Sequence, residues 1–372
     1  MIASTLASPR TINGCENGRV NRFRLTPVAV LFVAFAACSR DGAVRPTNPA
    51  LAGTTEARPY AGAPATSFPT SETAGVSTDA KLTPWTGSYR LSENIDGGTE
   101  TVDGKVCAVF EGLDVDFGTS GEFLYVDVAC AIFRTSRFRT DGPVFNTSAL
   151  VQQSSENELL IIDHCDFDGG PTHQRGVQAD YGDVVVTASE FARFGNAAVE
   201  MNDRSATHSF TATDNYLEET PGWARGDHVD GLQVGGGGAV TIRHNTILVV
   251  AYGGHEGDTT FVSNSAIGLW AEVGDVAGPV VVSGNLLAGG GRVMYVEEKD
   301  GFRFLGPVTI SDNVIDRRYT PLGGIWGIVS EDGRPDQLQW IDNTFEDDTP
   351  IDSPDPVGTA SLAPDGIKRS EA

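Results

Sequence analysis

One short stretch of this 372-residue chain gathers side chains that could move a proton. Residues 227–233 read Asp-His-Val-Asp-Gly-Leu-Gln, so that His228 comes two positions before Asp230. The imidazole could act as a general base or bind a metal ion, and Asp230 could orient it or act as a carboxylate itself. The alternative is structural: Asp230 and Gly231 turn the chain into a strand, and His228 is solvated.

Glu200 adds a second carboxylate to this chemistry. Hydrolysis of a glycosidic bond needs two carboxyl groups across that bond, about 5–5.5 Å apart for retention of configuration and further apart for inversion. Glu200 could form such a pair with Asp230 or with Asp180. The alternative for Glu200 is an ordinary solvated surface residue.

Elimination from a uronate sugar is the competing reaction. It needs a base near C5 of the sugar and a positive group that neutralises the sugar carboxylate. His228 could be that base, with Arg175, Arg204 or a calcium ion as the positive group. The residues do not identify a calcium site, so calcium is a cofactor that the reaction could use rather than one that the sequence assigns.

An internal repeat would bring these distant residues together. Five segments align without gaps and carry asparagine at the same place, namely Asn215, Asn245, Asn285, Asn313 and Asn343. Weaker copies upstream have Ser189, Cys165, Ser136 and Leu113 at that place. The nine positions are separated by 23, 29, 24, 26, 30, 40, 28 and 30 residues. A circuit of this length holds three short strands and three turns, and successive circuits stack as parallel strands about 4.8 Å apart.

Asparagine suits such a position for two reasons. Its side chain tolerates a left-handed bend between two strands, and it can bond to the asparagines above and below. The repeat therefore predicts an all-β solenoid of about nine coils.

The repeat resembles the right-handed parallel β-helix of the pectate-lyase superfamily, over roughly residues 100–346. The string around His228 is similar to His-x-Asp-Gly-(Leu/Ile)-Gln strings of secreted bacterial β-helix proteins. This resemblance implies a single-stranded right-handed parallel β-helix at residues 85–346, whose substrate groove lies over the sheet that follows the longest turns. Residues 162–165 resemble the Ile-Asp-His-Cys string of classical pectate lyases, but the Arg-x-Pro-x-x-Arg strand of that family is missing, so we interpret them as part of the repeat.

The strand after each long turn shows where such a groove would lie. With the apolar pair of each strand inward, the period of two predicts one outward column of Gln178, Glu200, Gln233, Gly268 and Tyr295. Long loops at residues 218–229 and 248–265 would form a wall beside it. We expect Glu200, His228, Asp230 and Gln233 to share one groove wall or floor, with Arg204 among the catalytic candidates.

Other polar and aromatic residues near this column could bind the sugars, since aromatic rings stack on sugar faces. The expected substrate-binding residues are Gln178, Gln233, His173, Arg175, Asp180, Trp223, Tyr252, His255, Trp270 and Tyr295.

The cysteines agree with the repeat. Cys107 lies six residues before Leu113, and Cys130 lies six residues before Ser136, so the two fall at equivalent places in adjacent coils. That separation predicts a disulfide. Cys165 occupies an inward place and is expected to be a buried small residue rather than a nucleophile.

The N-terminal segment predicts export. Arginines 19, 22 and 24 precede an apolar run at residues 25–37 that is too short to span a bilayer as a helix but suits a signal peptide at residues 1–37. Residues 35–38 resemble a bacterial lipoprotein cleavage box, which implies a lipid-modified Cys38 as the mature N-terminus. An ordinary signal peptide cut near Ala37 is the alternative. We therefore expect an exported protein, anchored to a membrane by lipid or extracellular.

Composition sets the remaining boundaries. Residues 38–84 are rich in Ala, Thr, Pro, Ser and Gly and predict a flexible stalk, and residues 347–372 predict a polar tail. The chain has 26 Lys and Arg against 50 Asp and Glu, a net charge of −24, which becomes −27 once residues 1–37 are removed. Nucleic acid is therefore a poor partner, and a polyanion would need calcium.

Three functions fit these observations. The first is an enzyme that cleaves a polysaccharide, either as a lyase or as a glycoside hydrolase, and this is the one we expect. The second is a non-catalytic carbohydrate-binding or adhesion module on the cell surface. The third is a purely structural surface protein.

Overall fold

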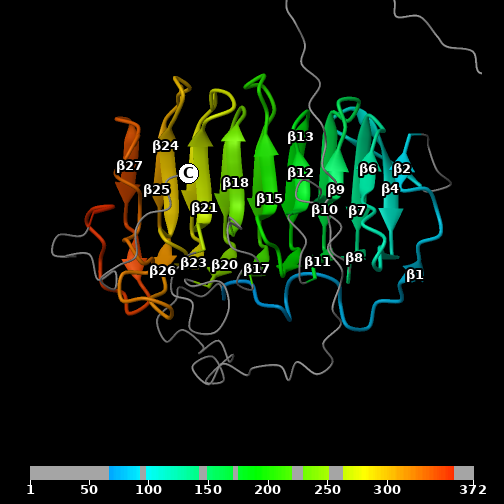
Figure 1. Cartoon of the computed structure of the whole chain (residues 1–372), viewed down its shortest axis with the longest axis horizontal. Helices are drawn as coiled ribbons and strands as arrows, with labels where there is room; N and C mark the ends of the chain where they lie inside the picture. The colour runs from blue at the N-terminus through cyan, green and yellow to red at the C-terminus, as the bar shows by residue number, and fades with distance from the viewer. Residues whose placement is uncertain are drawn as a thin grey trace, which may run out of the picture. The chain divides into compact units, whose positions relative to one another are not determined.

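The computed structural model describes residues 67–92, 98–141, 149–170, 175–219, 229–250 and 263–355. Within these ranges the chain forms strands and turns but no helix, and the strands form three long sheets (Figure 1). In each circuit the chain passes through the three sheets in turn, here called C, A and B. Neighbouring strands in a sheet belong to successive circuits, except for one antiparallel hairpin at residues 99–111 in sheet C. The predicted parallel β-helix is therefore confirmed.

The strands are short, and the three lists below follow chain order. Sheet A contains β1 (Thr83–Pro84), β5 (Leu113–Asp116), β8 (Arg137–Arg139), β11 (Asp166–Asp168), β14 (Glu190–Ala192), β17 (Tyr216–Glu219), β20 (Thr246–Val249), β23 (Leu286–Gly289), β26 (Val314–Ile315) and β28 (Thr344–Phe345). Sheet B contains β2 (Arg90–Leu91), β6 (Leu124–Val126), β9 (Ala149–Gln153), β12 (Arg175–Ala179), β15 (Ala197–Asn202), β18 (Asp230–Gly236), β21 (Ser265–Ala271) and β24 (Met294–Glu298). Sheet C contains β3 (Thr99–Val102), β4 (Lys105–Glu111), β7 (Cys130–Arg134), β10 (Leu159–Asp163), β13 (Asp183–Thr187), β16 (Phe210–Thr213), β19 (Val240–Arg243), β22 (Val280–Ser283), β25 (Val308–Ser311) and β27 (Leu338–Ile341).

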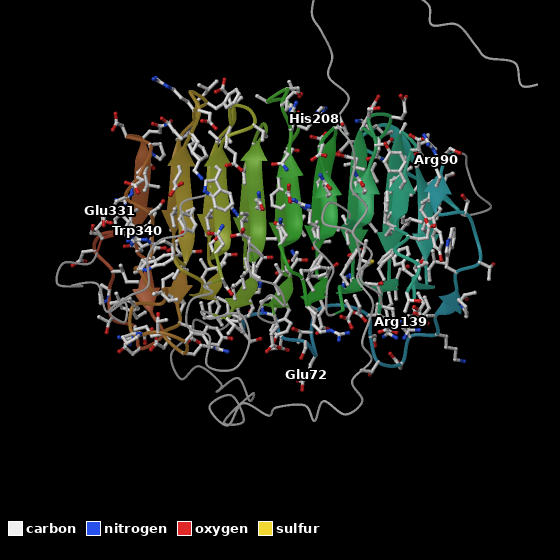
Figure 2. All side chains as sticks on the ribbon, in the orientation of Figure 1. Glu72, Arg90, Arg139, His208, Glu331 and Trp340 are labelled. Carbon is white, nitrogen blue, oxygen red and sulfur yellow. A yellow bond between two sulfur atoms is a disulfide. The ribbon has the colours of Figure 1, made fainter. Side chains whose placement is uncertain are left out.

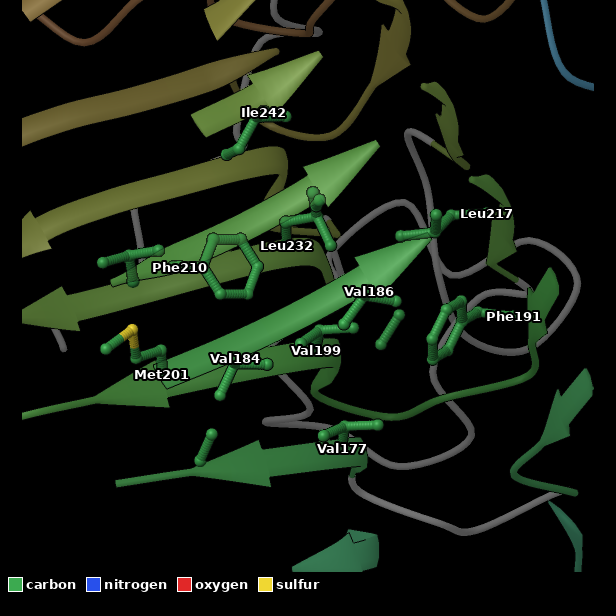
Figure 3. Close-up of a cluster of buried hydrophobic side chains, with 14 of the residues drawn as sticks. Val177, Val184, Val186, Phe191, Val199, Met201, Phe210, Leu217, Leu232 and Ile242 are labelled. Carbon is green, nitrogen blue, oxygen red and sulfur yellow. The ribbon is translucent and has the colours of Figure 1, made fainter. Parts of the chain in front are cut away.

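The core lies between the three sheets and is built from one inward side chain at every second position. Val177, Val199 and Leu232 come from neighbouring strands of sheet B and meet residues of sheets A and C in one apolar cluster (Figure 3). Aromatic rings also stack from coil to coil, with the centroids of Phe167 and Phe191 4.8 Å apart. Burial of these side chains provides the main driving force for stacking the coils.

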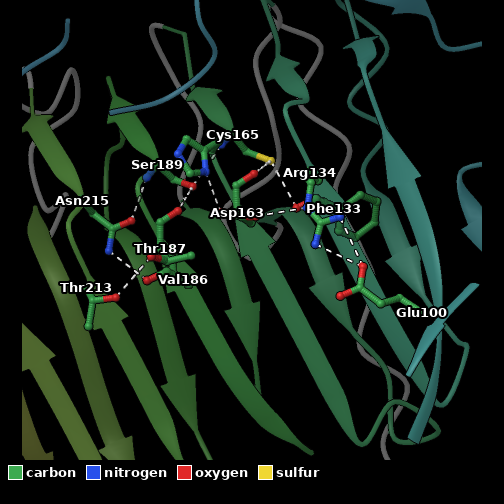
Figure 4. A network of polar contacts seen from close by, with 11 residues as sticks. Glu100, Phe133, Arg134, Asp163, Cys165, Val186, Thr187, Ser189, Thr213 and Asn215 are labelled. Atoms are coloured by element: carbon green, nitrogen blue, oxygen red, sulfur yellow. Dashed lines mark hydrogen bonds and ion pairs between the residues drawn. The ribbon is translucent and has the colours of Figure 1, made fainter. Parts of the chain in front are cut away.

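The asparagine ladder follows sheet C, where the chain turns into sheet A. Nδ2 of Asn245 donates to Oδ1 of Asn285 at 2.9 Å, and Nδ2 of Asn285 donates to Oδ1 of Asn313 at 2.8 Å. Upstream, the N–H of Cys165 donates to Oγ of Ser189, which extends the same column (Figure 4). Each ladder residue from Cys165 to Asn313 thus has a hydrogen-bond partner in the next coil. This satisfies the buried amides.

The left-handed bend belongs to a different residue from the one expected. The residues just before the ladder position have positive φ, including His164 at 52°, Asp214 at 59° and Asp312 at 58°. The asparagines therefore recur for their hydrogen bonds rather than for a left-handed backbone. His164 holds a turn position of the repeat.

The segment before the first coil lies along the outer face of sheet A (Figure 1). We call residues 67–82 the strap. The carbonyl oxygen of Pro69 accepts from Oγ1 of Thr246 at 2.6 Å, and the N–H of Val76 donates to Oδ1 of Asp166 at 2.6 Å. Glu72 points away from the solenoid (Figure 2). The expected stalk extended to residue 84, but its part from residue 67 onward is bonded to the solenoid.

A disulfide joins Cys107 of β4 to Cys130 of β7, with the two Cα atoms 4.4 Å apart. The equivalent places that the repeat assigns to these cysteines are therefore neighbours in adjacent coils, as predicted. Cys165 is buried and carries a free thiol.

Candidate functional site

The outward column expected from the sequence exists on sheet B. The strand register pairs Gln178 with Glu200, Glu200 with Gln233, Gln233 with Gly268, and Gly268 with Tyr295. The same register continues upstream to two residues that sequence reasoning missed, Gln152 and Tyr125. We call these residues the polar row, namely Tyr125, Gln152, Gln178, Glu200, Gln233, Gly268 and Tyr295.

Glu200 is more enclosed than its outward position suggests, because it is only 2% exposed. Nε of Arg175 donates to one carboxylate oxygen of Glu200, and Nδ2 of Asn202 donates to the other. Arg175 lies opposite Ala197, three residues before Glu200 on the neighbouring strand, so its long side chain reaches over the row. Arg175 is the ionic partner of Glu200, and its expected binding of substrate stays a prediction.

Asp230 begins β18 at the edge of the same face and is 1% exposed. Its carboxylate accepts hydrogen bonds from Oγ of Ser265 and from Nδ2 of Asn264, the latter at 3.1 Å. Burial raises the pKa of Asp230 to about 7, although the bonds from Ser265 and Asn264 oppose the rise. Asp230 is therefore poised to carry or release a proton near neutral pH.

The two carboxylates belong to neighbouring coils. Asp230 pairs with Ala197, and Glu200 lies three residues further along β15. At about 3.3 Å per residue along a strand and about 4.8 Å between strands, their Cα atoms are about 11 Å apart.

Three oxygen atoms beside Glu200 accept no hydrogen bond. Nε2 of Gln178 donates to Oδ2 of Asp180 at 3.1 Å, but Oε1 of Gln178 and Oδ1 of Asp180 are buried without a donor. Oδ1 of Asn202 is likewise buried without a hydrogen-bond donor. Burial raises the pKa of Asp180, while the hydrogen bond from Gln178 and the charges of Arg175 and Arg204 oppose that rise.

Asp203, Ser205 and His208 bring together the residue types of a nucleophilic triad, which sequence reasoning did not single out. The Asp203 carboxylate accepts the N–H groups of Ser205, Thr207 and His208, so it closes a turn. The hydroxyl of Ser205 donates to Asp203 at 2.6 Å and lies 3.4 Å from Nδ1 of His208, and that nitrogen is itself 3.2 Å from Asp203, so the imidazole does not act on the hydroxyl alone as a triad base would. We therefore assign this group to the turn. Arg204 on the same turn is exposed.

Trp270 and Tyr295 form an aromatic pair on sheet B, with ring centroids 5.6 Å apart. A side chain at Gly268 would have its Cβ 1.9 Å from the Trp270 ring, so only glycine leaves room for the indole there. The ammonium of Lys299 lies 5.2 Å from the centroid of the same ring. Because Trp270 is 5% exposed, Tyr295, which is partly exposed, is the ring of the pair that a sugar could meet.

A second group of acids, partly buried at Asp166 and Glu190, lies on sheet A under the strap. Burial, together with the nearby charges of Asp166 and Glu218, raises the pKa of Glu190 to about 7, while the charge of Arg137 opposes this rise. Sequence reasoning missed this group because its burial depends on the strap.

Several predicted residues lie outside the described part of the chain, namely Cys38, His173, Trp223, His228, Tyr252 and His255. The expected proximity of His228 to Glu200 therefore stays a prediction. In the residues that the structure describes, no three or more His, Cys, Asp or Glu side chains are grouped so as to hold a metal ion. None of these residues forms a helix long and apolar enough to cross a membrane.

Comparisons of the chain with family models, with curated proteins and with solved structures found no match.

Proposed function

We propose that the polar row of sheet B binds a glycan and that Asp230 and Glu200 hydrolyse one of its glycosidic bonds. The observation that carries this proposal is the contrast between the two carboxylates. Glu200 has a guanidinium partner, whereas Asp230 has only a hydroxyl and an amide as side-chain partners. Two carboxyl groups in environments that favour opposite protonation states are the usual arrangement for acid–base catalysis.

Each carboxyl group then has a distinct role. Asp230 keeps its proton up to about pH 7 and donates it to the departing glycosidic oxygen. Glu200, held as a carboxylate by Arg175, accepts a proton from the attacking water. Inversion of configuration requires carboxyl groups far enough apart to admit that water, and a Cα separation of about 11 Å is compatible with this requirement.

A non-catalytic glycan-binding module is the second candidate. The near-complete burial of Glu200 and Asp230 favours it, because both carboxylates also have structural hydrogen-bond partners. In that case the polar row and Tyr295 would bind sugars without cleaving them.

One assay separates these functions. The protein is incubated with neutral and acidic polysaccharides, with and without calcium, while reducing ends and ultraviolet absorbance are recorded. New ends without new absorbance support hydrolysis, and Asp230→Asn and Glu200→Gln should each lower the rate by roughly 10²–10⁴-fold. Thr241→Ala, on the outer face of sheet C, is the matched control and should keep the full rate. New absorbance would mean elimination, and binding without product would mean the binding module.

We also infer membership of the pectate-lyase superfamily and export as a lipoprotein. The ladder and the three parallel sheets support the first, and the apolar run ending at Cys38 supports the second. Incorporation of labelled palmitate that Cys38→Ser abolishes would support the lipid anchor, and labelling that persists in this variant would contradict it.

A further inference from the structure

The unpaired oxygens beside Glu200 are all hydrogen-bond acceptors. They belong to Gln178, Asp180 and Asn202, on two neighbouring coils. The three side chains are partly exposed, although the three oxygens themselves are covered by neighbouring atoms, so a ligand meets them once these side chains shift. A ligand that completes this arrangement has to supply donors rather than acceptors.

The carboxylates of Asp180 and Glu200 fix the orientation of the amides of Gln178 and Asn202. Nε2 of Gln178 donates to Asp180, and Nδ2 of Asn202 donates to Glu200. Turning either amide over would place its carbonyl oxygen against a carboxylate oxygen. The amide carbonyls therefore remain the groups without partners.

Two of the basic side chains that the structure describes on this face are already paired with acids. Arg175 is paired with Glu200, and Lys299 is paired with Glu297 at 3.3 Å and with Glu272 at 3.7 Å. The charge of Arg204 acts on Asp180. A sugar carboxylate would have to compete with these acids and would face a surplus of negative charge.

We propose that the glycan recognised at the polar row carries a protonated amino group, which binds between Gln178, Asp180 and Asn202. This inference rests on the proposed glycan function and names its substrate class. The ammonium supplies three donors to the three oxygens and compensates the charge of Asp180. A uronate has hydroxyl donors but adds a negative charge instead of compensating one.

The test compares three hexasaccharides of matched length on the unmodified protein by calorimetry: one of glucosamine, one of N-acetylglucosamine and one of galacturonate. The glucosamine hexasaccharide should bind at least roughly tenfold more tightly than the other two. That preference should shrink as sodium chloride rises to 0.5 M, because salt screens a partly exposed ion pair. Asp180→Asn should reduce the preference at least roughly fivefold.

Asp312→Asn is the matched control, because it removes one charge from an exposed turn with positive φ, which asparagine tolerates. It should leave the preference unchanged. Equal or tighter binding of the acetylated or the galacturonate hexasaccharide overturns the inference but leaves the proposed glycan function standing. Binding of none of the three also overturns the inference, and the proposed glycan function is then decided by the polysaccharide assay above. The ligand comparison needs no variant, so it remains decisive even if Asp180→Asn does not fold.

Discussion

At the scale of single residues, the site is defined by what each carboxylate touches. Glu200 and Asp230 are equally buried, yet one meets a guanidinium and the other meets neutral groups. Removal from water penalises the charged form of both, and a positive partner offsets that cost more than the neutral hydrogen bonds of Asp230 do. The difference between the two acids therefore comes from Arg175.

Asp230 makes protein stability depend on pH. Its pKa is about 7 in the folded protein, against 3.8 for the free side chain, so the folded state holds a proton that the unfolded state releases. The contribution of this retained proton to the free energy of unfolding is fully present below pH 3.8. It is lost as pH rises to about 7, and the loss is on the order of 4 kcal/mol. Urea unfolding of the wild-type chain and of Asp230→Asn between pH 4 and 8 measures it. The two curves should diverge with pH, and parallel curves would contradict the assignment.

Asn264 offers a finer test of the same group. Its amide lowers the pKa of Asp230, so Asn264→Ala should raise that pKa. If Asp230 is the general acid, the alkaline limb of the pH–rate profile moves upward by about 0.5–1 unit. Gln152→Ala, elsewhere in the polar row, should leave the limb in place. If the limb does not move in Asn264→Ala, Asp230 is not the group that transfers the proton.

Cys165 is predicted to be replaceable. Burial raises the pKa of its thiol to about 12, which leaves almost no thiolate at neutral pH. Cys165→Ser introduces the residue type that the ladder has at Ser136 and Ser189. The free energy of unfolding should change by less than about 1.5 kcal/mol, and any catalytic activity should persist. A complete loss of activity in a folded Cys165→Ser chain would show that packing is not its only role.

At the scale of strands, the register of the site residues could be predicted from the sequence, but their burial by neighbouring side chains could not. The alternation within each strand and the repeat of asparagine were sufficient to align Gln178, Glu200 and Gln233. The pairing of Arg175 with Glu200 depends on the length and direction of a side chain on another coil. The position of Trp270 over Gly268 likewise depends on three-dimensional packing that no periodicity records.

The strap is the element that sequence reasoning placed least well, since its composition is that of a linker. The attachment of the strap to sheet A can be tested with Asp166→Ala, which removes the acceptor of the Val76 N–H and the partner of Arg137. Hydrogen exchange at Val76 should accelerate by at least roughly tenfold, as the loss of one such bond allows. Asp168→Ala is the matched control, because Asp168 lies on the same strand but pairs with Arg193. Similar exchange in both variants would mean that Asp166 does not anchor the strap.

At the scale of the whole molecule, stability is a sum of neighbouring coils. Each strand bonds only to the coils before and after it, so the first coils can open without the last. The Cys107–Cys130 disulfide closes a separation of 23 residues among those first coils. Replacing both cysteines by serine should cost about 3 kcal/mol. Hydrogen exchange should rise in β4 and β7 and remain unchanged in β25, and uniform acceleration would contradict this picture.

The direction of the strap has a mechanical consequence. The strap contacts β20 near its beginning at Pro69 and β11 at Val76, and it leads into β1 beside β5, so it runs backward across the coils. A force pulling on the chain before residue 67 therefore loads the Pro69–Thr246 bond first and then each later contact in turn. Bonds loaded one after another yield at much lower force than bonds loaded together. The strap would peel away while the stacked coils stay intact, so tension would lengthen the connection before it reached the polar row.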